Sequence, residues 1–504
     1  MAAFTERAHG RLRRWLLIGA TLAAASASAI AFATGPSGVS APACATANTL
    51  DASGVEGGHS NFEIDAPIVG GTAKKPVTTA GANLTLDGAS PCVDWSTKAK
   101  GAGAGTSADL TSGVLVKPDK KSGAEDDAFG QGTSEENAVP TIVGGSIPPN
   151  KSDLQNFGIY RESNATGKFL NLFWSRVNSP SGTVDMDFEL NKLVCDGTAT
   201  NCANNGTNSG PAVYVTPKRS VGDRLVTYDL ASGGTVPTIS IYSWSGSSWS
   251  SGKVISGAEG EALGAINFSP IAGIDSGSLK EKDPFTFGEV SISYKALFSG
   301  LSGCGTFGSV YLKSRSSNTF TDELKDFVAP EAVQITNCTT LSTSSSNQTS
   351  AQTLSGSNTI SDTATLSGAS NPTGTITLKA YGPFDINTSA SGDTCTAEGA
   401  GANLVFTSAA LSLTGPDSSG NYSATASFVP TSAGRYEWVA SYSGDPNNGA
   451  SHTECLDEHE ASLVMETPGV STSLSSSSAN VGDKVHDGAT LSWTSSLKPS
   501  GTVT

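Results

Sequence analysis

Short runs in which apolar and polar residues alternate recur along the middle of the chain, from about residue 62 to residue 338. Clusters of Gly, Asn, Pro and Ser separate these runs, as turns separate strands. A period of two places one face of a strand in a core and the other in water, so the pattern predicts an antiparallel β-sandwich. The clearest runs are residues 169–174, 184–190, 224–230, 238–244 and 290–294.

One of these runs carries a row of acids. Asp185, Asp187 and Glu189 alternate with Met186 and Phe188, so the three acids share one face of the predicted strand. We interpret this face as the solvated side of the sheet. The alternative is a pair of carboxylates presented to a sugar or a cation, as a glycosidase requires.

One segment departs from the β pattern. Residues 321–327 are spaced as on a short helix, and Thr321 or Asp322 is suited to cap its N-terminus. We therefore expect a helix near the end of the central region.

A second pattern begins near residue 339 and then restarts. The segment 362–367, Asp-Thr-Ala-Thr-Leu-Ser, recurs about 125 residues later as 487–492, Asp-Gly-Ala-Thr-Leu-Ser. This offset is typical of tandem β-domains. A restart of two strands cannot bury a core, so we expect residues 471–504 to be poorly packed. We also expect the chain to be part of a longer product with further repeats and an attachment signal.

The N-terminus has the order of a secretory signal peptide. Four arginines at positions 7–14 precede an apolar, Ala-rich stretch at 15–30, and Ala31-Phe32-Ala33 forms a cleavage motif. The alternative is an uncleaved membrane anchor. No later run approaches the roughly 18 apolar residues of a transmembrane helix, so we expect a secreted, cell-surface-associated chain with no transmembrane segment after cleavage.

The chain is acidic and carries a net charge of −16. Removing the predicted signal peptide leaves 26 basic and 45 acidic residues. This balance argues against nucleic acid or anionic lipid as a partner.

Eight cysteines in an exported chain predict four disulfides. No close CxxC or Cys/His cluster suggests a metal site instead. Locality along the chain favours one set among the 105 connectivities that eight cysteines allow. The predicted pairs are Cys44–Cys92, Cys195–Cys202, Cys304–Cys338 and Cys395–Cys455.

The repeat has features that identify a family. The residues are Gly-Thr-Ile-Thr-Leu-Lys-Ala-Tyr-Gly-Pro at 374–383, Phe-Val-Pro-Thr-Ser-Ala-Gly-Arg-Tyr-Glu-Trp-Val-Ala-Ser-Tyr at 428–442, then Ser443-Gly444-Asp445 and Asn447-Asn448. They resemble the bacterial immunoglobulin-like (Ig-like) domains of long secreted surface proteins. The resemblance implies a seven-stranded sandwich without catalytic residues.

The central region resembles a large β-sandwich module that precedes such repeats in secreted proteins of Gram-positive bacteria. The matching segments are 62–65, 94–95, 126–129, 148–154, 222–226 and 313–317 with 324–327. We therefore expect an all-β chain with a large, jelly-roll-like antiparallel sandwich, an Ig-like sandwich and a truncated second Ig-like repeat. The predicted boundaries are 1–33 for the signal peptide, 34–60 for a flexible leader, 61–338 for the head, 339–467 for the Ig-like domain and 468–504 for the incomplete repeat.

The sequence bears on two kinds of chemical site, a nucleophilic triad and a calcium site. A nucleophilic triad is disfavoured, because no histidine lies in the central pattern and neither GxSxG nor HExxH occurs. Calcium is favoured over catalysis, since oxygen ligands often fix the loops of extracellular sandwiches. The candidate ligands are Asp65, Asp94, Glu125, Asp126 and Asp127, and the alternative is acidic loops kept for solubility.

Aromatic residues around the turn at 245–248 suggest a further site. Packing within the sheet is the favoured interpretation of Tyr242, Trp244 and Trp249, and the alternative is a sugar-stacking platform. We expect a non-catalytic, adhesin-like structural protein of the cell surface, with an extracellular glycan or matrix protein as partner. The alternatives are a carbohydrate-binding, lectin-like module and a glycan-cleaving enzyme. We expect no organic cofactor, and Ca²⁺ is the one ion that the sequence suggests.

Overall fold

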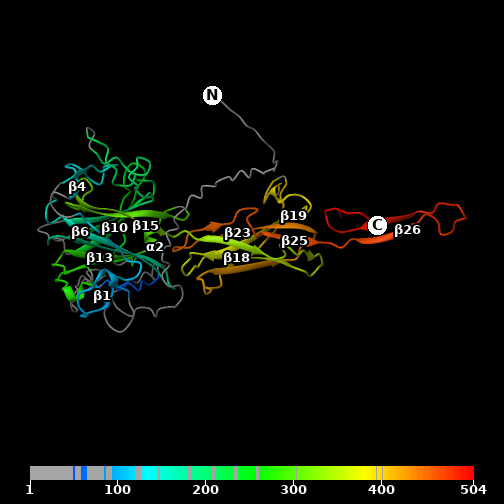
Figure 1. Cartoon of the computed structure of the whole chain (residues 1–504), viewed down its shortest axis with the longest axis horizontal. Helices are drawn as coiled ribbons and strands as arrows, with labels where there is room; N and C mark the ends of the chain where they lie inside the picture. Colours follow the sequence, from blue (N-terminus) through cyan, green and yellow to red (C-terminus); the bar gives the residue numbers. More distant parts are fainter. Residues whose placement is uncertain are drawn as a thin grey trace, which may run out of the picture. The chain divides into compact units, whose positions relative to one another are not determined.

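A computed structural model of the whole chain gives the architecture (Figure 1). It describes residues 49–50, 58–64, 84–86, 93–120, 126–145, 148–179, 184–206, 210–230, 236–256, 260–277, 279–301, 303–392, 394–399 and 401–504. The predicted signal peptide and most of the predicted leader lie outside these residues. The expected all-β class is confirmed, since antiparallel sheets form nearly all of the regular structure.

The head contains two large sheets that face each other. The first has eight strands in the order β11-β10-β9-β8-β14-β15-β4-β5, and the second has five in the order β12-β13-β7-β6-β3. The first comprises β4 (Asp127–Phe129), β5 (Ile142–Gly144), β8 (Asp185–Asn191), β9 (Arg224–Leu230), β10 (Val236–Ser243), β11 (Lys253–Val254), β14 (Thr306–Arg315) and β15 (Leu324–Thr336). The second comprises β3 (Leu115–Pro118), β6 (Leu154–Ser163), β7 (Lys168–Arg176), β12 (Ala262–Ile266) and β13 (Phe287–Ser293).

The main core lies between these two sheets. From the eight-stranded sheet it receives Met186, Phe188 and Val226, and from the five-stranded sheet Leu172 and Val290, all fully buried. These are the apolar positions of the alternating runs, so the predicted period of two sets the inner face of both sheets.

The outer faces of both sheets are also covered. Every residue of β7, β8 and β13 is buried. Phe62 and Trp95 pack with Phe173 of β7 on the outer side of the five-stranded sheet. On this side β1 (Thr85–Leu86) pairs with β2 (Ser96–Ala99) in a small parallel sheet. The interpretation of the acidic face of β8 as solvated is therefore wrong, because other segments of the chain cover it.

The helix expected at 321–327 is also absent from this part of the structure, because residues from Leu324 onward form β15. Pairing with β14 along most of its length overrides the local helical spacing. The helices that the structure describes are short: α2 (Tyr294–Phe298), capped by the side chain of Ser293, and the 3-10 turns Ser107–Asp109, Gly273–Asp275 and Ala390–Gly392.

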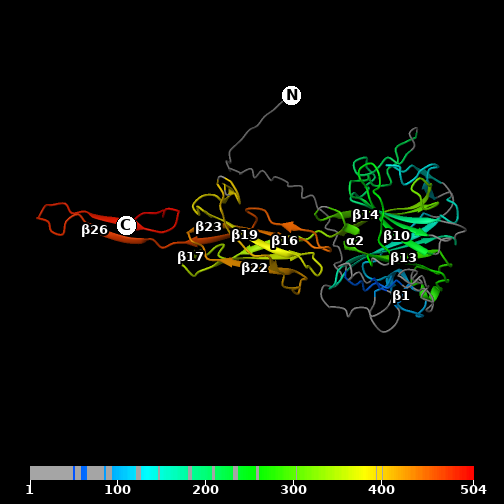
Figure 2. The ribbon, with the colours of Figure 1, turned by 180° about the vertical axis from the view of Figure 1, so that it is seen from behind.

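Residues 340–465 form two further sheets (Figure 2). One has the order β16-β18-β22, and the other has β17-β25-β23-β19-β20 with β21 beside β19 and β24 beside β23. Their bounds are β16 (Thr340–Ser345), β17 (Gln352–Thr353), β18 (Ile360–Ser367), β19 (Thr375–Phe384), β20 (Leu404–Thr407), β21 (Leu411–Ser412), β22 (Tyr422–Phe428), β23 (Gly434–Tyr442), β24 (Ser451–His452) and β25 (Ala461–Met465).

The core of this second sandwich centres on Trp438. Its ring contacts Phe406 and Phe428, and its indole N–H donates to Ser462 Oγ at 3.1 Å. Two acids are buried in the same sandwich, Asp362 in β18 and Glu460 just before β25. Burial, and then the nearby charge of Glu460, raise the pKa of Asp362 to about 7.

Residues 469–492 form a hairpin of β26 (Gly469–Leu474) and β27 (Asp487–Ser492). All of β26 and nearly all of β27 are exposed, including Val470 and Leu474. Among the described residues, no helix has the length and apolar character needed to cross a membrane.

Candidate functional site

The densest group of charged side chains lies on the outer face of the eight-stranded sheet. Antiparallel register places Asp185 opposite Arg315, Asp187 opposite Lys313 and Glu189 opposite Tyr311. We call this group the ionic face. It consists of Glu135, Asp185, Asp187, Glu189, Arg219, Asp229, Lys313 and Arg315.

Arg315 forms one half of the ionic face. Its Nε and Nη2 donate to the two carboxylate oxygens of Asp187 at 2.8 and 3.1 Å, and Nη2 also donates to Asp229 Oδ1 at 2.8 Å. Its third nitrogen donates to the carbonyl of Ser317 at 2.6 Å. Asp185 lies farther away, with its Oδ2 4.0 Å from Nη1. Burial raises the pKa of Asp185 to about 7, although Arg315 opposes the shift.

Glu189 is the centre of the other half. Arg219 donates to both of its carboxylate oxygens, at 2.9 and 2.8 Å, while Lys313 Nζ and the Tyr311 hydroxyl each donate to Oε2 at 2.8 Å. Burial disfavours the Glu189 carboxylate, but the charges of Arg219 and Lys313 outweigh it and hold the pKa below its ordinary value. Glu135 pairs with the same two cations and has a raised pKa, chiefly because it is buried.

Two of the three aromatic residues around the turn at 245–248, Trp244 and Trp249, enclose Arg219. The guanidinium lies 4.9 Å from the ring centre of Trp244 and 4.8 Å from that of Trp249, and the two rings meet edge to face. Trp244 is only 2% exposed, so it cannot stack on a sugar. Tyr242 is half-buried against Phe320. Trp244 therefore does not form the alternative sugar platform, because its ring face contacts a cation of the protein itself.

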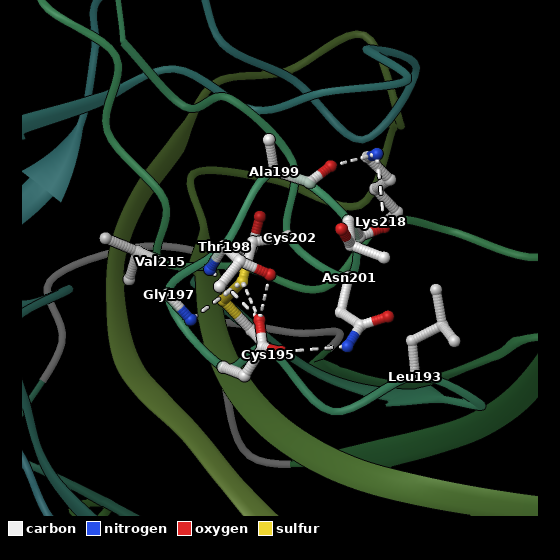
Figure 3. The surroundings of a disulfide bond; sticks show 12 residues. Leu193, Cys195, Gly197, Thr198, Ala199, Asn201, Cys202, Val215 and Lys218 are labelled. Carbon is white, nitrogen blue, oxygen red and sulfur yellow. Dashed lines mark hydrogen bonds between the residues drawn. A yellow bond between two sulfur atoms is a disulfide. The ribbon is translucent and has the colours of Figure 1, made fainter.

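A small disulfide loop contacts the segment that leads to Arg219; Figure 3 shows this loop together with Lys218. Cys195 and Cys202 are joined, and Gly197 N–H donates to Cys202 Sγ at 3.2 Å. Cys202 in turn pairs with Pro217 in a β-bridge, and Lys218 N–H donates to the Asn201 carbonyl at 2.9 Å. Because Arg219 follows directly, the loop fixes the segment that delivers its guanidinium to the ionic face.

The structure contains three of the four predicted disulfides. Besides Cys195–Cys202, these are Cys304–Cys338 and Cys395–Cys455. The fourth predicted pair, Cys44–Cys92, lies outside the described residues.

A second group of acids lies at the edge of the head, where the two sheets approach. One carboxylate oxygen from each of Asp119, Asp126 and Asp326 lies within 4.8 Å of the others. Asp119 follows β3, Asp126 precedes β4, and Asp326 belongs to β15, so both sheets contribute. We call these three residues the edge cluster.

Of the predicted calcium ligands that the structure describes, only Asp126 belongs to the edge cluster. Outside it, Asp127 is ion-paired with Lys120 and Asp94 accepts a hydrogen bond from Trp95 N–H. The other two predicted ligands, Asp65 and Glu125, lie outside the described residues. Asp119 and Asp326 were missed, since neither stands in an acidic run and the segment around Asp326 was expected to be helical.

Comparison with known proteins leaves the chain without a family. No family model matches it, and no curated protein matches it. A marsupial T cell receptor aligns over 61% of this chain and 73% of its own, with 11% identity and a TM-score of 0.18. A red sea bream transglutaminase aligns over 63% of this chain and 32% of its own, with 10% identity and a TM-score of 0.18. Similarity at this level supports no inference about this chain.

Proposed function

We propose that this chain is a non-catalytic, extracellular structural protein that presents its large sandwich at a cell surface. Three disulfides favour an oxidising compartment outside the cytosol. The β-rich architecture and the resemblance of residues 374–448 to Ig-like repeats favour a role in spacing and presentation.

The main support for a non-catalytic role is the burial and hydrogen bonding of the carboxylates in the ionic face. A glycosidase needs an acid and a base, or an acid and a nucleophile, that contact the sugar. Asp187 and Glu189 are fully buried, and each is held by two hydrogen bonds from an arginine. Such carboxylates neutralise buried cations and stabilise the covering segments, and no substrate reaches them.

The experiment is a screen of the full chain against arrays of glycans and extracellular matrix proteins, followed by product analysis of every glycan that is retained. We expect retention of a glycan or matrix protein without release of shorter sugars. Hydrolysis that is lost in Glu189→Gln but kept in the surface control Glu331→Gln would contradict the proposal. Glu331 is suitable because its side chain is 33% exposed and pairs with a surface lysine.

A further inference from the structure

The edge cluster joins parts of the head that are distant in sequence. Asp119 N–H donates to the Gln155 carbonyl of β6 at 2.8 Å, which fixes this residue to the five-stranded sheet. Asp326 accepts from Leu154 N–H at 2.7 Å and from Phe327 N–H at 2.9 Å. The backbone of both sheets thus holds these carboxylates in place, and the short distances between them are set by the fold.

Two oxygens of the cluster are buried without a hydrogen-bond donor. Asp126 is fully buried, and its Oδ1 accepts from Asp127 N–H at 2.9 Å while Oδ2 has no donor. Oδ2 of Asp119 is likewise buried and has no donor. A buried carboxylate oxygen is costly unless a donor or a cation satisfies it. The cluster is therefore more than a group of solvated acids.

The protein supplies too little positive charge to balance the cluster. Lys120, whose charge favours ionisation of Asp126, is itself ion-paired with Asp127. A divalent ion at the cluster would supply the missing positive charge.

We propose that Asp119, Asp126 and Asp326 bind a divalent cation, Ca²⁺, that links the two sheets of the head. Three carboxylates with no nitrogen or sulfur ligand favour a hard ion. Calcium–oxygen distances of 2.3–2.6 Å allow opposite ligands up to about 5 Å apart, which accommodates the limit of 4.8 Å. Magnesium keeps several of its waters and is usually bound through one or two carboxylates, so three carboxylates supplied by the protein favour calcium.

A fourth acid lies close to the site. Asp153 directly precedes Leu154, whose N–H donates to Asp326 at 2.7 Å. The chain therefore brings a further carboxylate next to the segment that holds Asp326.

The test measures thermal unfolding and calorimetric Ca²⁺ binding of the full chain, after EDTA treatment and dialysis, in three forms. These are the unaltered protein, Asp126→Asn and the matched control Asp127→Asn. Asparagine at 126 keeps an oxygen for the Asp127 N–H but removes the charge. We expect a dissociation constant of about 0.1–1 mM, as in extracellular modules, and a rise of roughly 2–5 °C in the unfolding temperature at tenfold excess over it.

The variants separate the outcomes. We expect Asp127→Asn to respond to Ca²⁺ like the unaltered protein and Asp126→Asn to lose at least tenfold in affinity. We also expect Asp126→Asn to be at least as stable as the unaltered protein in EDTA, because it relieves repulsion. Absence of binding to the unaltered protein would overturn the proposal. So would equal binding by Asp126→Asn, since the ion would then lie elsewhere.

Discussion

Arg315→Met tests whether the ionic face stabilises the head as an internal ion-pair network. The guanidinium of Arg315 is fully buried and contacts Asp187 at 2.8 and 3.1 Å. Methionine retains much of the aliphatic length, so the substitution mainly removes the charge and its hydrogen bonds. Asp187 would then be left as a buried carboxylate without its principal partner.

The expected cost follows from that burial. Removing one partner of a buried, hydrogen-bonded ion pair costs about 3–5 kcal/mol, because the remaining charge cannot be solvated. A surface pair contributes about 1 kcal/mol or less. The matched control is Lys117→Met, which breaks the 2.9 Å pair of Lys117 with Glu331, where both side chains are about one-third exposed.

The assay is unfolding in guanidinium chloride with the disulfides intact, followed by tryptophan fluorescence. Trp95, Trp174 and Trp244 are buried in the head and report on its transition. With a denaturant slope of about 4–6 kcal/mol/M, the loss corresponds to a midpoint lowered by about 0.5–1.5 M. We expect the Lys117→Met midpoint to change by less than about 0.3 M.

A double variant identifies the cause. Asp187→Asn together with Arg315→Met removes the stranded charge as well as its partner, so the double variant should be more stable than Arg315→Met alone. The reasoning would be refuted if Arg315→Met matched the Lys117→Met control. It would also be refuted if the double variant lost the sum of two large single penalties.

Three further predictions concern other parts of the chain. The folded-state pKa of Asp362 is raised to about 7, above its unfolded value, so the second sandwich should lose stability as pH rises from about 4 to about 8. Asp362→Asn should remove about 3 kcal/mol of the loss between pH 5 and pH 8, as urea unfolding will show, while Glu460, whose pKa burial also raises to about 7, should keep the rest. Replacing both Cys304 and Cys338 by serine opens a 34-residue loop and should cost about 4 kcal/mol, seen as a lower unfolding temperature under non-reducing conditions; an unchanged temperature would contradict it. Trp438→Ala should destabilise the second sandwich by about 3–5 kcal/mol in the same assay, and a loss below 1 kcal/mol would show that the pocket collapses around the change.

Many strands of both sandwiches could be predicted from the sequence because apolar and polar residues alternate along them. Met186 and Phe188 mark one face of β8, and Trp438 and Ala440 mark one face of β23. Periodicity reports only which residues share a face, however. It does not reveal whether a polar face meets water or a covering segment. The polar face of β8 meets buried cations from β14.

The edge cluster could be predicted only in part. Asp126 stands in an acidic segment, so composition alone made it a candidate. Asp119 and Asp326 are 207 residues apart in the sequence, and their meeting depends on how β3 of one sheet lies beside β15 of the other. Local propensity also misassigned residues 321–327, where pairing between strands determines the structure.

The disulfide between Cys304 and Cys338 has a mechanical consequence. Both β14 and β15 lie inside the loop that it closes, and the chain continues from Cys338 into β16. Tension applied to the chain beyond Cys338 passes through the sulfur–sulfur bond to Cys304 and bypasses the residues between them. The backbone of the hairpin that supplies Lys313, Arg315 and Asp326 therefore carries no load while that bond is intact, and pulling on the chain beyond Cys338 does not unzip β14 from β15.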